Sequence, residues 1–247
     1  MIGPETARRI LEVATEYWTE AVQEGAFVTL ASGKEIGHRI ADFVDEKTTA
    51  LLETQFETKR EVTASGRPRP RSMGDLWLGD NGIFHPVNVK AGEAGKNGQP
   101  NMVSLTKLLE ALLKRHIDSY YLLIVKMTMP GVPAAAELPA EDLDVSQIVP
   151  HVYFVDMLEH LEFITFDAGP GQAMLKEKQF YEAFGCGQVS APMSVMEKVS
   201  HLAALMEDGD RRLIENRRRK MDRLRKDVEN YMLQPTHEVD QAGVKLG

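Results

Sequence analysis

The sequence predicts an α/β fold in which helices flank a mixed β-sheet and a helical part closes the chain. Apolar residues recur at helical spacing near both ends of the chain. Between them, residues 74–90 read as a β-hairpin, and residues 120–127 form an apolar run with the length of a buried strand. We interpret residues 1–247 as one domain with a tail at 234–247.

Two helices are expected before the hairpin. Pro4 and the apolar residues that follow it at helical spacing predict a helix over residues 4–24. Ser32 and Glu35 have the spacing of a capping box, which predicts a second helix with Val44 and Leu52 among its inward residues. Residues 63–73 contain prolines and a glycine, so they predict an exposed loop.

The hairpin brings together three side chains with complementary chemistry. Asp80-Asn81-Gly82 is a strong turn signal between its two strands. Folding at this turn brings Asp75 towards Asn88 and Lys90, which share one face because side chains alternate along a strand. A carboxylate, an amide oxygen and an ammonium then converge, a grouping that suits Mg²⁺, a water molecule and a phosphate.

Further elements follow the hairpin in order. A helix is expected over 101–116, the strand at 120–127, a second strand over 148–155, and a less regular apolar segment over 160–166. A turn-rich loop over 167–172 leads to a helix at about 173–184, and two helices close the chain at about 194–207 and 210–232. In the last helix, an apolar stripe that includes Leu213, Val228 and Tyr231 is expected to pack on the body.

Composition is that of a soluble globular protein, with 43% hydrophobic and 27% charged residues. The single cysteine, Cys186, excludes an intrachain disulfide, and there is no signal-peptide pattern or membrane-length apolar run. We therefore expect a cytoplasmic protein without membrane contact. No glycine-rich loop matches a phosphate-binding fingerprint, so no nucleotide cofactor is expected. The net charge of −8 opposes nucleic-acid binding overall, but residues 211–226 hold nine Lys or Arg against two acids.

Around the hairpin the chain resembles the PD-(D/E)xK nucleases, most closely the EcoRV-like branch of type II restriction endonucleases. The family pattern of Asp, a spacer and Asp/Glu-x-Lys reads here as Asp75, twelve residues, and Asn88-Val89-Lys90. Gly74 replaces the usual proline, and Asn88 replaces the second acid. The order αββαβ over residues 30–130 matches the nuclease core, and residues 145–233 would carry DNA recognition.

The resemblance implies a Mg²⁺-dependent type II restriction endonuclease that cleaves double-stranded DNA as a homodimer at a short palindromic sequence. Asp75 and Asn88 would hold the metal, and Lys90 would act on the water. An acid from the preceding helix would complete the site, with Glu35 as first choice, then Asp42 and Glu46. Candidates for DNA contact are basic and amide side chains in nearby loops: Arg67, Arg69, Arg71, Lys96, Asn97, Gln99, Asn101 and Gln172.

Two alternatives remain open at this stage. One is a DNA repair or recombination nuclease with the same core and no palindromic target. The other is a DNA-binding protein whose nuclease core is inactive, and Asn88 is the residue that supports it, because Mg²⁺ favours carboxylate ligands.

Overall fold

The computed structural model describes residues 1–26, 36–67, 69, 72–93, 101–128, 149–185 and 193–233, with the side chains of 36–41, 92–93, 101, 185 and 233 outside the description. Its centre is a five-stranded sheet in the order β1-β2-β3-β5-β6. β3 and β5 run parallel, and the other neighbours run antiparallel, so the sheet is mixed. The strands are β1 (Thr58–Lys59), β2 (Leu76–Asp80), β3 (Ile83–Glu93), β5 (Tyr121–Thr128) and β6 (Val149–Asp156).

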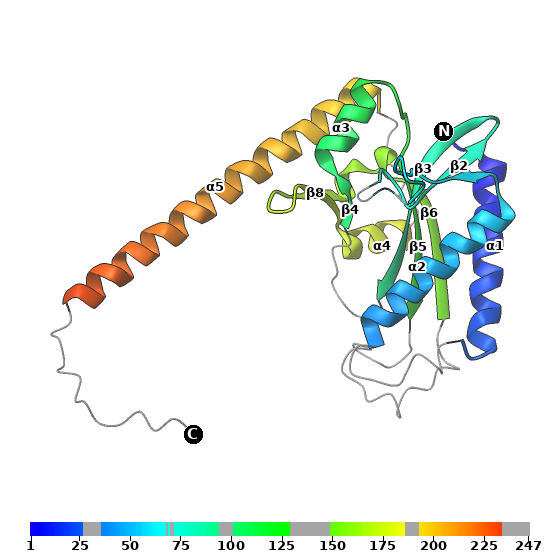
Figure 1. Cartoon of the computed structure of the whole chain (residues 1–247), viewed down its shortest axis with the longest axis horizontal. Coiled ribbons are helices and arrows are strands. Elements are labelled where there is room, and N and C mark those ends of the chain that lie inside the picture. Colours follow the sequence, from blue (N-terminus) through cyan, green and yellow to red (C-terminus); the bar gives the residue numbers. More distant parts are fainter. Residues whose placement is uncertain are drawn as a thin grey trace.

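Two helices, α1 (Pro4–Gln23) and α2 (Ile36–Gln55), cover one face of this sheet (Figure 1). Ile10 of α1 and Leu52 of α2 are fully buried against Leu78 and Val89 of the sheet. Farther along the helices, Trp18 donates a hydrogen bond from Nε1 to Thr48 Oγ1 at 3.0 Å, which ties α1 to α2. α2 is thereby fixed over β3.

The other face carries a larger apolar core. α3 (Leu105–Leu113) provides the crossover from β3 to the parallel strand β5. Beside it lies a second sheet in the order β4-β8-β7, made of β4 (Asn101–Ser104), β8 (Gln172–Leu175) and β7 (Ile164–Asp167). The short helices η4 (Met157–Glu159) and η5 (Leu161–Phe163) and the helix α4 (Glu177–Gly185) complete this layer.

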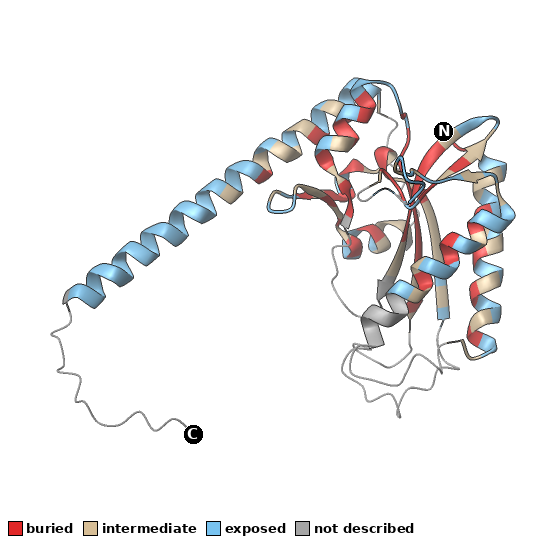
Figure 2. Ribbon diagram, viewed as in Figure 1, coloured by how far each residue is buried: buried red, intermediate tan, exposed pale blue. Residues whose placement is uncertain are grey.

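The last helix, α5 (Val195–Leu233), has two different environments (Figure 2). Its first part is anchored, because Leu202 is fully buried and Lys198, only 4% exposed, forms an ion pair with Glu159. Gly209 lies against Phe166, where a Cβ atom would approach the ring to 2.4 Å. Beyond Gly209 the helix stands clear of the body, and every residue from 214 to 232 is exposed.

The predicted α/β class with a mixed sheet and a C-terminal helix is confirmed. The first helix matches its predicted range, and the hairpin turn has positive φ at Asn81 (51°) and Gly82 (78°), as the sequence indicated. The strand predicted at 120–127 is β5, and the one at 148–155 is β6. Among the described residues, no helix combines the length and apolar character needed to cross a membrane.

Four predictions were wrong. Residues 101–104 form β4 instead of the first turn of a helix, and residues 173–175 belong to β8 instead of starting a helix, because the two strands pair with each other. The two C-terminal helices are one, since Gly209 fits against Phe166 without ending the helix. The apolar stripe of the last helix does not pack on the body, as Val228 and Tyr231 are 57% and 77% exposed.

Candidate functional site

Asp75 lies just before β2, at the point where β3 continues without β2 on one edge and stays paired with β5 on the other. β2 pairs with β3 only as far as Val87, and Asp75 donates its backbone N–H to the Val87 carbonyl at 2.9 Å. The Asp75 carboxylate then accepts the next free amide of β3, Val89 N–H, at 2.8 Å. Gly74 makes this approach possible, because a Cβ atom there would lie 2.6 Å from the Val87 carbonyl oxygen. Asp75 itself is exposed.

A second carboxylate, Asp45 of α2, binds the same open edge of β3 one step farther along. It accepts a hydrogen bond from the backbone of Ala91. Its Oδ1 is buried and has no hydrogen-bond partner among the described residues. Val89 and Ala91 are alternate residues of one strand, so their amides point to the same edge. The two acids therefore line the stretch of β3 that β2 leaves uncovered.

The electrostatics of Asp45 place Lys90 and Asp75 beside it. The pKa of Asp45 is raised from 3.8 to about 6, first by burial of the carboxyl group. The ammonium of Lys90 opposes this rise, and the negative charge of Asp75 adds to it. Two carboxylates and one ammonium thus share a single electrostatic neighbourhood, in which Asp45 is half-ionised near pH 6.

Asn88 is held beneath this edge by two hydrogen bonds. Val87 and Val89 pack on the α1–α2 side, so Asn88 and Lys90 share the opposite face of the strand; that these two residues share a face is what the sequence predicted. Asn88 Nδ2 donates to the Met102 carbonyl at 2.8 Å and to the Tyr120 hydroxyl oxygen at 3.1 Å. Its Oδ1 is buried without a partner in the described part of the chain. Asp75 is close enough to raise the pKa of Tyr120, after the larger effect of burial.

Among the described residues of α2, the acid beside Asp75 and Lys90 is Asp45, which the sequence did not single out. Glu35 lies outside the described residues, and Asp42 and Glu46 are both exposed on α2. Asp45 is next to Val44 and one turn before Thr48, both fully buried, so it borders the inward stripe of the helix. The sequence held no signal for it, because Asp42, Asp45 and Glu46 lie within about one turn of the same helix.

In the predicted exposed loop before Asp75, the described residues 63–67 and 69 are closed into a hairpin by backbone hydrogen bonds. Thr63 N–H donates to the Arg67 carbonyl at 2.8 Å, and Arg69 N–H donates to the Glu61 carbonyl at 2.8 Å. Glu61 Oε1 accepts from Met73 N–H at 2.9 Å, which ties the hairpin to the start of the site. Arg67 and Arg69 are exposed on one arm, and Arg71 lies outside the described residues.

Of the remaining DNA-contact candidates, Gln172 is the one whose side chain the structure describes. Lys96, Asn97 and Gln99 lie outside the described residues, as does the side chain of Asn101, whose backbone begins β4. Gln172 begins β8 and is half-buried, with its Oε1 enclosed by protein. This side-chain oxygen is therefore not exposed to solvent. A residue that reads a base edge through its amide oxygen would need that oxygen to be exposed.

The donor chemistry at the edge fits a hard divalent cation such as Mg²⁺. The buried Asp45 Oδ1 and Asn88 Oδ1 have no hydrogen-bond partner within the described residues, and the Asp75 carboxylate is exposed. Oxygen atoms of carboxylates and amides are the ligands that Mg²⁺ prefers. No group of three or more His, Cys, Asp or Glu in the described ranges could hold a metal, so this set depends on the amide of Asn88 as its third member.

A His, a Ser and an Asp also meet elsewhere, beside a cavity of about 570 Å³ between the β2–β3 turn, α3 and the start of α5. His85 Nδ1 lies 2.8 Å from Ser119 Oγ, which donates to Asp118 Oδ1 at 2.9 Å. Ser119 is fully buried, and burial lowers the pKa of His85. The serine bonds to both partners and is closed to substrate, so the group does not have the arrangement of a hydrolase triad.

No protein-family model matches the chain, and a search of curated proteins gives no significant match.

Proposed function

We propose that the protein is a Mg²⁺-dependent endonuclease that hydrolyses phosphodiester bonds of double-stranded DNA. The observation that supports this best is the open edge of β3, where Asp75 and Asp45 bind successive free amides beside Lys90. The α2-β2-β3-α3-β5 order around it agrees with the αββαβ core of the PD-(D/E)xK nucleases, with the short strands β1 and β4 added. The specific core and activity are inferred from this arrangement.

In this proposal, Asp75, Asp45 and the Asn88 Oδ1 would hold Mg²⁺ against the scissile phosphate. A bound Mg²⁺ supplies charge neutralisation at the phosphate and acidifies the attacking water. The amides of Val89 and Ala91 fix the orientation of the two carboxylates, so little reorganisation is needed when the ligand arrives.

Lys90 orients the water and stabilises the negative charge that builds up on the phosphate oxygens. Water attacks phosphorus as the bond to the 3′ oxygen breaks, and the proton lost by the water ends on that oxygen. The products are a 5′-phosphate and a 3′-hydroxyl. The exposed Arg67 and Arg69 would contact phosphates beside the cut, because their hairpin is tied to Met73 just before Asp75.

We further propose that the enzyme is of type II, acting as a homodimer at a short palindromic sequence. One site of this kind cleaves one strand, and a second copy related by two-fold symmetry would cleave the other. A repair or recombination nuclease with the same chemistry would show no preferred sequence. Sequencing the ends of digested phage DNA distinguishes the two.

The deciding experiment compares Lys90→Ala with a matched control. Lys114 is exposed, forms only an i,i+4 pair with Glu110, and lies at the end of α3. With plasmid DNA and Mg²⁺, Lys90→Ala should lose cleavage while keeping DNA affinity within about tenfold, and Lys114→Ala should cut like the wild type. Cleavage by Lys90→Ala at more than a few per cent of the wild-type rate would remove Lys90 from the site.

One observation favours a second candidate, a DNA-binding protein with an inactive core. Both protons of the Asn88 amide group are donated, to Met102 and Tyr120, so the position is built for asparagine. A wild-type protein that binds DNA but does not cleave it with Mg²⁺ or Mn²⁺ would support this candidate over the nuclease.

A further inference from the structure

The part of α5 from Ile214 onward is exposed on all sides, although it continues for about 30 Å at 1.5 Å per residue. A lone helix gains little stability in water from backbone hydrogen bonds alone, and most helices in proteins depend on packing. The ion pairs within this segment, such as Arg219 with Glu215 and Arg225 with Asp222, are exposed and contribute little. This stretch therefore lacks the packing that stabilises the rest of the molecule.

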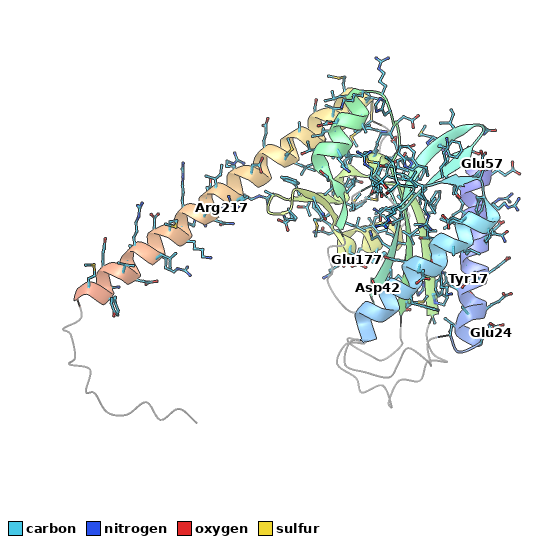
Figure 3. All side chains as sticks on the ribbon, viewed as in Figure 1. Tyr17, Glu24, Asp42, Glu57, Glu177 and Arg217 are labelled. Atoms are coloured by element: carbon cyan, nitrogen blue, oxygen red, sulfur yellow. The ribbon has the colours of Figure 1, made fainter. Side chains whose placement is uncertain are left out.

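One face of this segment carries a heptad repeat, which we name the distal seam. Its members occupy the a and d positions of successive heptads: Ile214, Arg217, Met221, Leu224, Val228 and Tyr231. The five apolar members are between 47% and 77% exposed. Arg217 projects from the free part of the helix, clear of the body (Figure 3). A spacing of 3.5 residues is the pattern of a helix that packs along another helix.

We propose that the distal seam binds the distal seam of a second copy of this chain, with the two helices antiparallel. In one antiparallel register all six positions are used, with Ile214 opposite Tyr231, Arg217 opposite Val228, and Met221 opposite Leu224. The two-fold axis then passes between Met221 and Leu224. This interface would provide the contact surface of the homodimer in the proposed function. The inference rests on the proposed function only for the role of the dimer, and the interface itself is inferred from the distal seam.

Charge decides the orientation. In a parallel pair, Arg217 at a d position would meet Arg217 of the other copy inside the seam, and Lys220 would face Arg225. In the antiparallel pair, Arg217 lies opposite Val228, between Asp227 and Glu229 of the other copy. Lys220 and Asp227 flank the seam and face each other twice, once on each side of the axis. Arg218 and Arg225 also face each other there, but Arg225 has Asp222 beside it on its own helix at 3.9 Å.

The first test measures mass by sedimentation equilibrium of the full chain. The wild type should form a dimer of about twice 27.6 kDa in the micromolar range, because the seam is short. The double variant Met221→Glu/Leu224→Glu should be monomeric, whereas Asn216→Glu/Asn230→Glu adds the same charge on the outer face and should stay dimeric. Circular dichroism of each variant checks that the helix is retained.

The second test is a charge exchange. Lys220→Asp and Asp227→Lys should each weaken the dimer by roughly fivefold, and the double variant should restore it. A stronger dimer with Lys220→Asp would overturn the antiparallel orientation. A wild type that remains a monomer at about 200 µM would overturn the interface. If the wild type is a monomer and Met221→Glu/Leu224→Glu loses DNA affinity, the distal seam binds DNA and the interface is likewise overturned. Cleavage is not measured in these tests, so their failure is distinct from failure of the nuclease proposal.

Discussion

Replacing Asp45 by asparagine should make the protein more stable, by an amount that depends on pH. The pKa of Asp45 is 3.8 when unperturbed and about 6 in the folded protein, where burial disfavours the charged form. A raised carboxyl pKa means that the folded state binds the proton more tightly than the unfolded state. The resulting stabilisation is complete below pH 3.8 and is lost as pH rises through about 6.

The size of the effect follows from the two pKa values, with each pKa unit worth about 1.4 kcal/mol. Relative to low pH, where Asp45 is protonated in both states, its titration lowers the unfolding free energy by about 1 kcal/mol at pH 4.5 and by about 3 kcal/mol at pH 8. Asparagine keeps an oxygen that can accept from Ala91 N–H but has no charge to bury. The gain in unfolding free energy on Asp45→Asn should therefore grow by about 2 kcal/mol between pH 4.5 and pH 8.

Urea unfolding of wild type and variant at the two pH values measures this difference. Glu46→Gln is the matched control, because Glu46 is an exposed acid on the same helix and is not among the charges that shift the pKa of Asp45. Added Mg²⁺ should stabilise the wild type more than Asp45→Asn, since the ligand binds the ionised carboxylate. A gain that is equal at both pH values, or a wild type that is more stable than Asp45→Asn at pH 8 without metal, would refute the reasoning.

Three further outcomes are expected. Asn88→Asp should lower the unfolding free energy by about 2–4 kcal/mol in urea unfolding, because a carboxylate cannot donate a hydrogen bond to Met102 or Tyr120. A variant that is equally stable and cuts faster would show that the position tolerates the family's acid. Gly74→Ala should lower the cleavage rate and the thermal stability together, because the new Cβ would displace the backbone that positions Asp75. An unchanged cleavage rate would contradict the proposed placement of Asp75 in the active site. Replacing Arg67, Arg69 and Arg71 together by alanine should weaken DNA binding. The log–log slope of affinity against salt concentration should also fall by about 0.9 for each phosphate that is no longer neutralised. An unchanged slope would show that these arginines do not contact DNA.

Local signals in the sequence predicted the local parts of the fold. The Asn81-Gly82 turn has the positive φ values that only such residues adopt readily, so the hairpin and the face shared by Asn88 and Lys90 could be predicted from the residues alone. By contrast, the segments of β4 and β8 have sequences compatible with helix, and their strand conformation depends on pairing between segments far apart in the chain. No local pattern records that pairing.

The site shows the same division. Asp75 and Lys90 belong to a continuous motif, but Asp45 joins them from a helix that ends at Gln55, well before β2 begins. By sequence alone Asp42 and Glu46 are equally plausible acids, and only the rotation of α2 against β3 separates them from Asp45. That rotation is set by the burial of Val44, Thr48 and Leu52, which is a property of packing instead of spacing. Likewise, Gly209 reads as a helix break until Phe166 is seen to need the space.

The two carboxylates at the edge of β3 have a consequence for solubility. An uncovered stretch of strand is a template on which a strand from another molecule can add, and this is a common start of aggregation. Here the amides of Val89 and Ala91 are already bonded to Asp75 and Asp45, so an incoming strand meets occupied donors and negative charge. Alanine at both acids would free these amides. The acids proposed for catalysis therefore also keep the sheet from growing into its neighbours.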